Sequence, residues 1–506
     1  MNQIFDVAII GGGINGCGCA ADAALRGLSV VLLEQDDLAS KTSSSSTKLI
    51  HGGLRYLEHY EFNLVKKALV ERQRLLDLAP HLVYPQALVL PYEQHMRPAW
   101  FLRLGLFIYD HLSFKNRLPR SKRINRRKTP SLFSPLKNKL DQGLLFYDGT
   151  ADDSRLTLVN AIQAKNHGAS IRTHSTVTKA DTVNNIWKLT VQPQQGANYT
   201  LYAKTLINAA GPWVTNVEQL THTPKHQKIS LIKGSHIVVP QMYEGEHAYF
   251  LQHQDKRMIF VIPYHGFSMI GTTDVSLQEK PETVSISNEE INYLLDLVNQ
   301  YFKTRISEND IIYTWSGIRA LLANDTKKAQ TLSRDYDYKL YLKPAPVVTI
   351  YGGKITTYRQ LAEETINCLK AIFPELKPSS TATTPLPGAT FECMNFDEYV
   401  RYARDKYQWM DTQLLNRYLY TYGTYMEKIM RLCPDEKALG KCYGADLYQA
   451  EIDYLIVEEW ARSCDDILKR RTKLDLSMDE ASKKELGHYL DNITSYHRAQ
   501  TEPLLH

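Results

Sequence analysis

The chain has 506 residues, 43% of them hydrophobic and 23% charged, which is typical of a globular protein with two to four domains and excludes disordered and fibrous classes. Its 60 Lys and Arg residues outnumber its 55 Asp and Glu residues by only five, so the charge does not indicate a nucleic-acid-binding protein. Seven cysteines without a CxxC pair favour reduced thiols in the cytoplasm over a disulfide framework or a metal site.

The sequence predicts neither a signal peptide nor a membrane-spanning helix. The first patterned segment begins at residue 4 with no basic leader before it, so we do not expect secretion. The longest apolar stretch, residues 99–112, contains Arg103 and Asp110 and is shorter than the roughly 20 residues that cross a bilayer. We expect a cytoplasmic protein whose contact with a membrane is peripheral.

The start of the chain has the pattern of a βαβ unit. Residues 5–10 read as a buried strand, residues 15–26 as an Ala-rich helix and residues 29–33 as a second buried strand. Glycines occupy the GxGxxG positions between the first strand and the helix, where they let the backbone approach a pyrophosphate, and an acidic residue closes the second strand, where it can bind ribose hydroxyls. The unit therefore predicts an adenine dinucleotide site. The expected contacts are Gly11, Gly13, Ile14, Asn15, Gly16 and Glu34.

A hydroxyl-rich run, residues 41–48, follows this unit. By itself the run is equally typical of a flexible linker and of a loop that wraps a cofactor with small hydrogen-bond donors. Its place just beyond the acidic strand end allows the second interpretation.

Further along the chain, the patterns predict more α/β structure and then a helical region. The expected elements are helices over 61–79 and 156–167, strands over 187–191 and 206–211, β-rich segments over 230–240 and 258–273, a helix over 288–302, a strand over 347–351 and a helix over 357–372. Residues 377–388 hold three Pro and five Ser or Thr residues, which predicts a linker. Residues 389–506 read as almost wholly helical.

An ordered set of short motifs extends over nearly the whole chain. They are residues 11–16, 43–58, 208–213, 232–236, 270–274, 316–319, 333–336, 352–359 and 447–473. The set resembles the FAD-dependent glycerol-3-phosphate dehydrogenases of the aerobic, respiratory type, within the broader group of D-amino-acid-oxidase-like flavoproteins. In one motif the chain departs from the family, because Ala320 follows Arg319 where Pro is more common.

The resemblance implies an α/β fold in three parts. A FAD-binding Rossmann-like domain of the glutathione-reductase or D-amino-acid-oxidase type is interleaved with a mixed β-sheet substrate domain and followed by a helical C-terminal domain. The implied bounds are 1–78, 145–220 and 332–376 for the FAD-binding domain, 79–144 and 221–331 for the substrate and membrane-facing domain, 377–388 for the linker and 389–506 for the helical domain.

The resemblance also implies a reaction. FAD accepts a hydride from C2 of sn-glycerol 3-phosphate, dihydroxyacetone phosphate is formed, and the electrons pass to membrane quinone. One alternative is an α-glycerophosphate oxidase that uses oxygen and releases hydrogen peroxide, although the oxidases carry an insertion for which this chain leaves little room. Amine or amino-acid oxidation is another, because residues 208–213 are shared with those oxidases. A flavin-bound docking protein without catalysis is the alternative outside enzymes.

Three residue sets follow from the resemblance. Beyond the βαβ unit, the FAD contacts are Thr42, Ser43, Ser44, Ser45, Ser46, Lys48, Leu49, His51, Gly52, Val177, Ala210, Gly211, Trp213, Gly353, Lys354, Ile355 and Thr356. The substrate contacts are Arg55, Tyr56, Thr273, Asp274, Arg319 and Arg334. The catalytic residues are His236, Arg319, Lys354 and His51.

Each catalytic residue has a chemical reason. One guanidinium group can bind two phosphate oxygens at once, so Arg319 and Arg334 favour a phosphorylated substrate over an amine. Imidazole titrates near neutral pH, which makes His236 our preferred base and His51 its competitor. Lys354 can place a positive charge where reduction of the flavin builds negative charge. A structural histidine and an ordinary lysine at a helix start are the plainer interpretations.

The segment between Arg97 and Lys128 is strongly basic. It contains ten Lys and Arg residues and one acidic residue, Asp110, and it is interleaved with aromatic and apolar residues. This pattern predicts an interfacial patch attracted to anionic lipid on the inner face of the cell membrane, where a quinone would be met. The alternative is a solvated basic loop beside a core helix. A homodimer is compatible with the sequence.

Overall fold

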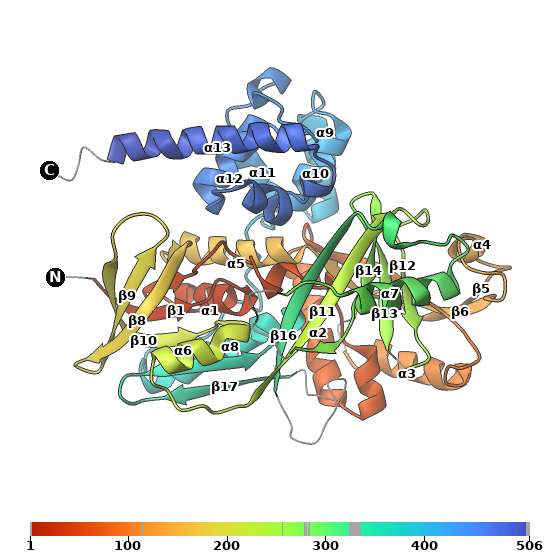
Figure 1. Cartoon of the computed structure of the whole chain (residues 1–506), viewed down its shortest axis with the longest axis horizontal. Coiled ribbons are helices and arrows are strands. Elements are labelled where there is room, and N and C mark those ends of the chain that lie inside the picture. The colour runs from red at the N-terminus through yellow and green to blue at the C-terminus, as the bar shows by residue number, and fades with distance from the viewer. Residues whose placement is uncertain are drawn as a thin grey trace.

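The computed structural model describes residues 3–113, 116–255, 257–277, 281, 284–322 and 335–501, without the side chains of Arg55, Glu58, His59 and residues 494–501. Two sheets lie side by side, and a helical C-terminal region covers one edge of the pair (Figure 1). The predicted α/β fold with a helical C-terminal domain is confirmed.

The first sheet has the strand order β17-β18-β10-β1-β2-β7, with β9 paired to β10 and β8 to β9. Its members are β1 (Ile4–Ile10), β2 (Val30–Leu33), β7 (Ser170–Arg172), β8 (Ser175–Val183), β9 (Ile186–Pro193), β10 (Tyr199–Asn208), β17 (Tyr336–Tyr341) and β18 (Val347–Gly352). The central strands β2, β1, β10 and β18 are parallel, and most of their residues are buried because helices cover the sheet.

Three helices pack against this sheet and against one another, namely α1 (Ile14–Leu25), α5 (Asp153–Asn166) and α8 (Tyr358–Cys368). α1 is rich in Ala and Gly, so it approaches the strands and both neighbouring helices closely. Asp152 caps α5 by accepting a hydrogen bond from the backbone N–H of Arg155. The βαβ unit predicted from the start of the sequence is therefore present.

The second sheet is mixed and has the order β15-β11-β14-β13-β12-β4-β6-β3, with β16 paired to β11 and β5 to β6. Its members are β3 (Leu49–Ile50), β4 (Val83–Pro91), β5 (Lys122–Asn125), β6 (Gln142–Ala151), β11 (Ile229–Pro240), β12 (Ala248–Gln252), β13 (Met258–Tyr264), β14 (Phe267–Gly271), β15 (Val275–Ser276) and β16 (Tyr313–Leu322). β3 pairs with β6 in this sheet, so β3 and residues 145–151 of β6 belong to it by strand pairing, although the sequence-based bounds place these residues in the FAD-binding part. The domain bounds remain a prediction.

Further helices cover the second sheet and its ends, namely α2 (Phe62–Leu78), α3 (Ala99–His111), α4 (Pro130–Phe133) and α7 (Asn288–Tyr301), whereas α6 (Val214–Leu220) packs on the first sheet. α7 begins at a complete capping box made by Ser287 and Glu290, and it packs its apolar face on the sheet. In the part of the chain that the structure describes, no helix is both long and apolar enough to cross a membrane.

The C-terminal region consists of helices around a core of its own. They are α9 (Phe396–Lys406), α10 (Thr412–Tyr422), α11 (Met426–Met430), α12 (Gln449–Glu459), a π-helix (Asp466–Arg471) and α13 (Glu480–Thr501). Residues 377–388 contain no helix or strand and lead to this region from α8. The region sits above α5, and α13 extends past the other C-terminal helices over the first sheet (Figure 1).

Candidate active site

A cavity of about 650 Å³ is lined by both sheets, and most of the residues expected to bind cofactor or substrate lie on its wall. Those on the wall are Gly11, Gly13, Ile14, Asn15, Glu34, Thr42, Ser43, Ser45, Ser46, Leu49, His51, Tyr56, Val177, Ala210, Gly211, Trp213, Asp274, Arg319, Gly353, Lys354, Ile355 and Thr356. Gly16, Ser44, Lys48, Gly52, His236 and Thr273 are not on the wall. The side chain of Arg55 and the whole of Arg334 lie outside the described residues.

The turn between β1 and α1 requires glycine. Gly11 has a φ of +114°, and a Cβ there would lie 2.6 Å from the carbonyl oxygen of Ala209. A Cβ at Gly16 would lie 1.9 Å from the carbonyl oxygen of Gly11. The tight turn brings the N-terminus of α1 to the cavity, where its free N–H groups and positive dipole end suit a pyrophosphate. Ser43 Oγ already accepts one of these N–H groups, that of Ile14, at 3.0 Å.

Glu34 lies on the cavity wall at the end of β2. Burial raises the pKa of its carboxyl, although the backbone N–H groups of Asp36 (2.9 Å) and Gly12 (2.6 Å) donate hydrogen bonds to the two oxygens and oppose that shift. Each carboxylate oxygen keeps a further acceptor site, so the group can also bind hydroxyls of a ribose.

The hydroxyl-rich run is held in place on the wall rather than hanging free. Thr42 donates a hydrogen bond to the carbonyl oxygen of Ile318 at 2.8 Å. Ser45 packs so closely on Gly317 that a Cβ there would lie 2.9 Å from the Ser45 Cβ. Ser46 donates to Asp153 through both its backbone N–H (3.0 Å) and its hydroxyl (2.7 Å). These contacts fix the run between the two sheets.

Some of the expected residues support the wall from behind. Lys48, 7% exposed, pairs with Asp153 at 2.8 Å and donates to the carbonyl oxygen of Ser44 at 3.0 Å. The Gly52 N–H donates to the hydroxyl of Tyr109. Asn15 contributes to the wall and also donates to the carbonyl oxygen of Gly352 at 3.1 Å, which ties α1 to the turn that carries Lys354.

Two cationic side chains reach the cavity from opposite sheets. Arg319 of β16 forms an ion pair with Asp274 and donates to Thr272 Oγ1 at 3.0 Å. There is no room beside it for a side chain on β11, because a Cβ at Gly234 would lie 2.6 Å from the guanidinium. Lys354, after β18, lies 4.3 Å from the centre of the Tyr56 ring. Both cations stand on the wall of the same cavity.

The two candidate bases differ in their access to the cavity. His51 is on the wall. His236 is 1% exposed, stacks on Trp315 with ring centres 5.2 Å apart, and lies 3.0 Å from the Thr47 hydroxyl through Nε2. Burial, helped by the charges of Lys48 and Arg319, lowers the pKa of His236 well below its usual value. His236 is therefore neutral near pH 7, and it contacts Thr47, which is on the cavity wall.

Thr273 is also turned away from the cavity. It is 1% exposed, donates to Glu290 at 2.6 Å and accepts from the backbone N–H of Ser235 at 2.9 Å. Its neighbour Thr272 is on the wall. The cavity wall therefore contains Thr272, whereas Thr273 was expected there from the sequence.

Several wall residues were not expected from the sequence. Thr47 and Thr272 lie inside the quoted motifs, so the motifs held a signal for them. An apolar part of the wall had no such signal, since its members come from distant strands. They are Leu88, Phe146, Phe250, Met258 and Phe260.

The chain is similar to known families and proteins over nearly its whole length. The family described as FAD dependent oxidoreductase matches residues 6–341, and the C-terminal domain of alpha-glycerophosphate oxidase matches residues 379–498. A glycerol-3-phosphate dehydrogenase of Pseudomonas aeruginosa is 45% identical over 494 residues, covering 97% of this chain and 96% of the relative. A D-erythritol 1-phosphate dehydrogenase of Brucella abortus is 41% identical over 491 residues, covering 96% and 98%.

A solved structure shows the same fold. The glycerol-3-phosphate dehydrogenase from Bacillus halodurans, solved in complex with FAD, aligns with a TM-score of 0.76 at 24% identity and covers 97% of this chain and 94% of its own. The alignment includes the helical C-terminal region, since so little of either chain is left out.

Proposed function

Since the chain belongs to the family of FAD-dependent glycerol-3-phosphate dehydrogenases, we propose that it oxidises sn-glycerol 3-phosphate to dihydroxyacetone phosphate and passes the electrons to a membrane quinone. The observation that supports this choice of substrate is the composition of the cavity wall. One end has the glycine turn and acidic strand end of a dinucleotide site, and the wall also holds Arg319 and Lys354.

The residues present fit FAD. The N-terminus of α1 and the hydroxyl of Ser43 suit its pyrophosphate, and Glu34 suits its ribose. Lys354 is placed to offset negative charge at the flavin ring. When bound, FAD supplies the acceptor for the hydride that leaves C2 of the substrate.

We assign phosphate binding to Arg319. Its guanidinium is oriented by Asp274 and Thr272, and an oriented guanidinium presents a fork of donors that matches two phosphate oxygens. Asp274 also limits the site to one strongly anionic group, because it neutralises part of the positive charge. A phosphate with two negative charges competes for this arginine better than a carboxylate with one.

We assign the general base to His51, because His51 is on the cavity wall whereas His236 is not. The imidazole of His51 accepts the proton of the C2 hydroxyl as the hydride leaves, so that the carbonyl forms without a charged intermediate. His236 then acts as a positioning residue: its neutral ring holds the Thr47 hydroxyl on the wall.

The apolar part of the wall suits an apolar electron acceptor. Phe250 stacks on Phe260 with ring centres 4.7 Å apart, and Phe146 meets Phe250 edge to face. Such a surface favours a quinone ring over a small polar acceptor. This cluster also packs against Leu102 and Leu106 of α3, which leads outward to the surface.

The outer face of α3 supports contact with a membrane. Trp100, Leu104 and Phe107 recur at helical spacing and are 66%, 48% and 59% exposed. Exposed basic residues, including Arg97 and Arg103, lie on or beside the same helix. This combination is typical of a helix that lies in the lipid interface. Arg126, by contrast, is used internally, because it donates to four backbone carbonyl groups.

The test is to mix the purified protein anaerobically with sn-glycerol 3-phosphate while following the oxidised flavin band. We expect bleaching that a soluble quinone analogue reverses. Rapid reversal by oxygen with peroxide release, and none by quinone, would instead assign an oxidase. D-erythritol 1-phosphate is the second substrate to test, because the Brucella relative carries that name at 41% identity. Bound FAD that neither phosphate bleaches would contradict the proposal.

A further inference from the structure

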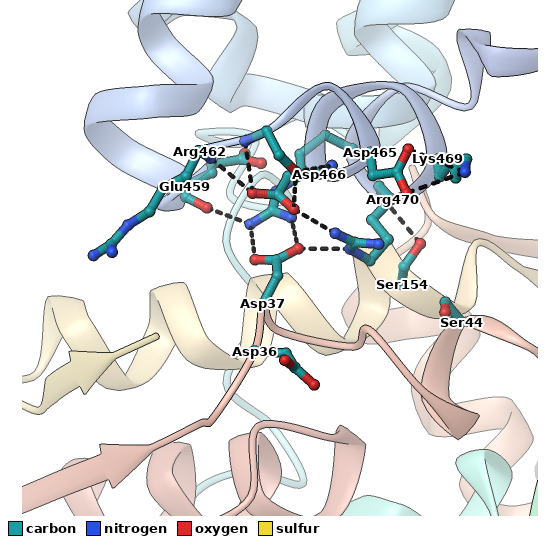
Figure 2. A network of polar contacts seen from close by, with 12 residues as sticks. Asp36, Asp37, Ser44, Ser154, Glu459, Arg462, Asp465, Asp466, Lys469 and Arg470 are labelled. Atoms are coloured by element: carbon teal, nitrogen blue, oxygen red, sulfur yellow. Dashed lines mark hydrogen bonds and ion pairs between the residues drawn. The ribbon is translucent and has the colours of Figure 1, made fainter. Parts of the chain in front are cut away.

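The helical C-terminal region reaches the cofactor side of the molecule through a buried cluster of charges (Figure 2). At its centre is Asp37, four residues beyond the end of β2 and 2% exposed. Its carboxylate accepts a hydrogen bond from Arg470 Nε at 2.6 Å and from both terminal nitrogens of Arg471, with Nη2 at 2.7 Å. Two guanidinium groups from the far end of the chain therefore hold one carboxylate.

The two arginines are themselves fixed from the C-terminal side. Arg471 is fully buried and also donates to the backbone carbonyl of Glu459 at 2.7 Å. Arg470 forms a second ion pair with Asp466, which in turn accepts from Ser463. Both arginines end a π-helix, a rare form that often occurs at functional sites.

Asp37 belongs to the loop that forms one side of the cofactor cavity. Glu34 and Gln35 before it, and Ala39 and Ser40 after it, are on the cavity wall, whereas Asp37 faces away. The loop also touches the glycine turn, because the Ala39 N–H donates to the carbonyl oxygen of Gly12 at 3.0 Å. The contact with the arginines thus holds the wall from outside.

A second contact reaches the other end of the same loop through the start of α5. Lys473 is 6% exposed, lies 3.1 Å from Asp152 Oδ1 and donates to the Ser154 hydroxyl. The intervening Asp153 accepts from Ser46 and Lys48, where the hydroxyl-rich run ends. Lys473 and Lys48 both have left-handed backbones, with φ of +62° and +59°, a strained conformation that persists only where the surroundings enforce it.

We propose that residues 470–473 form a clamp that holds both ends of the loop of residues 36–48 in the shape that retains FAD, which makes the helical C-terminal region a determinant of cofactor retention. Asp37, Arg471 and Lys473 are positioning residues that act through the wall. The inference rests on FAD as the cofactor and does not depend on the substrate, so release of FAD tests it separately from turnover.

The experiment compares two buried carboxylates that are each bound by guanidinium donors. Asp37→Asn removes the charge that the clamp holds. Glu451→Gln is the matched control, because Glu451 is fully buried and pairs with Arg417 at 2.6 Å and 2.7 Å wholly inside the helical region. Each holoenzyme is diluted at a temperature well below its unfolding temperature. The rise in fluorescence as FAD is released is then followed with time.

We expect Asp37→Asn to release FAD about tenfold faster or more, since charge-assisted hydrogen bonds are lost, while Glu451→Gln lowers the unfolding temperature without changing release. Arg471→Lys keeps the charge but not the fork, so it should give intermediate release. Equal release rates in all variants, or equal acceleration by the control, would overturn the clamp. So would loss of soluble protein in both Asp37→Asn and Arg471→Lys, because the contact would then be a folding determinant.

Discussion

We expect Arg319 to carry most of the phosphate recognition, because its guanidinium is oriented on the cavity wall by Asp274 and Thr272. Replacement by Ala removes a bidentate contact of about 3 kcal/mol, so we expect Arg319→Ala to raise KM for sn-glycerol 3-phosphate by about 100-fold or more. Arg319→Lys should recover only part of the loss, since a single ammonium cannot replace the fork. Steady-state kinetics at saturating FAD measure both; an unchanged KM would remove Arg319 from the phosphate site.

The two histidines give opposite expectations. His51→Gln removes the proposed base, so kcat should fall by about 100-fold or more. A base that must be unprotonated makes kcat/KM decline toward low pH, and this decline should disappear in the variant. Gln in place of His236 can still donate to or accept from the Thr47 hydroxyl. We therefore expect His236→Gln to keep this decline and to lower kcat less than His51→Gln does. The pH profiles of kcat/KM distinguish the two. Loss of the profile in the His236 variant alone would return the role of base to His236.

Among the elements, α3 exposes three large apolar side chains on its outer face. Replacing Trp100, Leu104 and Phe107 by Ser removes three exposed apolar side chains that together can contribute about 3 kcal/mol or more on burial in lipid. We therefore expect the triple variant to bind vesicles of phosphatidylcholine and phosphatidylglycerol at least about 100-fold more weakly. Co-sedimentation with the vesicles measures the binding.

The control for α3 uses apolar residues elsewhere on the surface that are even more exposed. Leu432 and Val457 lie on the helical C-terminal region and are 83% and 70% exposed. Leu432→Ser with Val457→Ser should leave vesicle binding unchanged. Equal losses in both variants would mean that general surface hydrophobicity, and not α3, carries the affinity. In the triple variant, flavin reduction by substrate should stay normal.

Prediction from sequence succeeded where an element is defined by its own residues. The strand, glycine turn, helix and second strand at the start of the chain are consecutive, so their periodicity and punctuation suffice. Pairing between distant segments left no local signal, and β3 with β6 could not be assigned to the second sheet for that reason. The same limit applies to side-chain direction: the motif of residues 270–274 contains both threonines, but only the fold decides that Thr272 faces the cavity.

At the scale of the whole molecule, the helical C-terminal region is joined to the rest by buried polar groups. Besides the clamp, Arg155 of α5 forms a buried ion pair with Glu459 of α12. Near this pair, His81 is fully buried between the two parts, and a Cβ at Gly388 would lie 2.8 Å from its Nε2. Neither ring nitrogen of His81 has a hydrogen-bond partner among the described residues. The contact between the two parts therefore requires a neutral histidine.

This requirement makes stability depend on pH with a defined sign. Burial, with a contribution from the charge of Arg155, lowers the pKa of His81 to about 3, whereas an exposed histidine titrates near 6.5. Between these values the unfolded chain binds a proton at this site and the folded chain does not. The free energy of unfolding therefore falls as the pH drops below about 6.5, by about 2 kcal/mol at pH 5 for this one group.

His81→Phe should remove that dependence while keeping a ring in the same place. No hydrogen bond is lost at neutral pH, so the variant should be about as stable as the unmodified chain near pH 7.5. At pH 5 the variant should be the more stable of the two by about 2 kcal/mol, because His81 no longer draws a proton into the unfolded state. Urea unfolding at both pH values gives this double difference, in which the other buried histidines cancel. Identical pH dependence in the two proteins would show that His81 has the same pKa in the folded and unfolded states, so the assigned shift would be wrong.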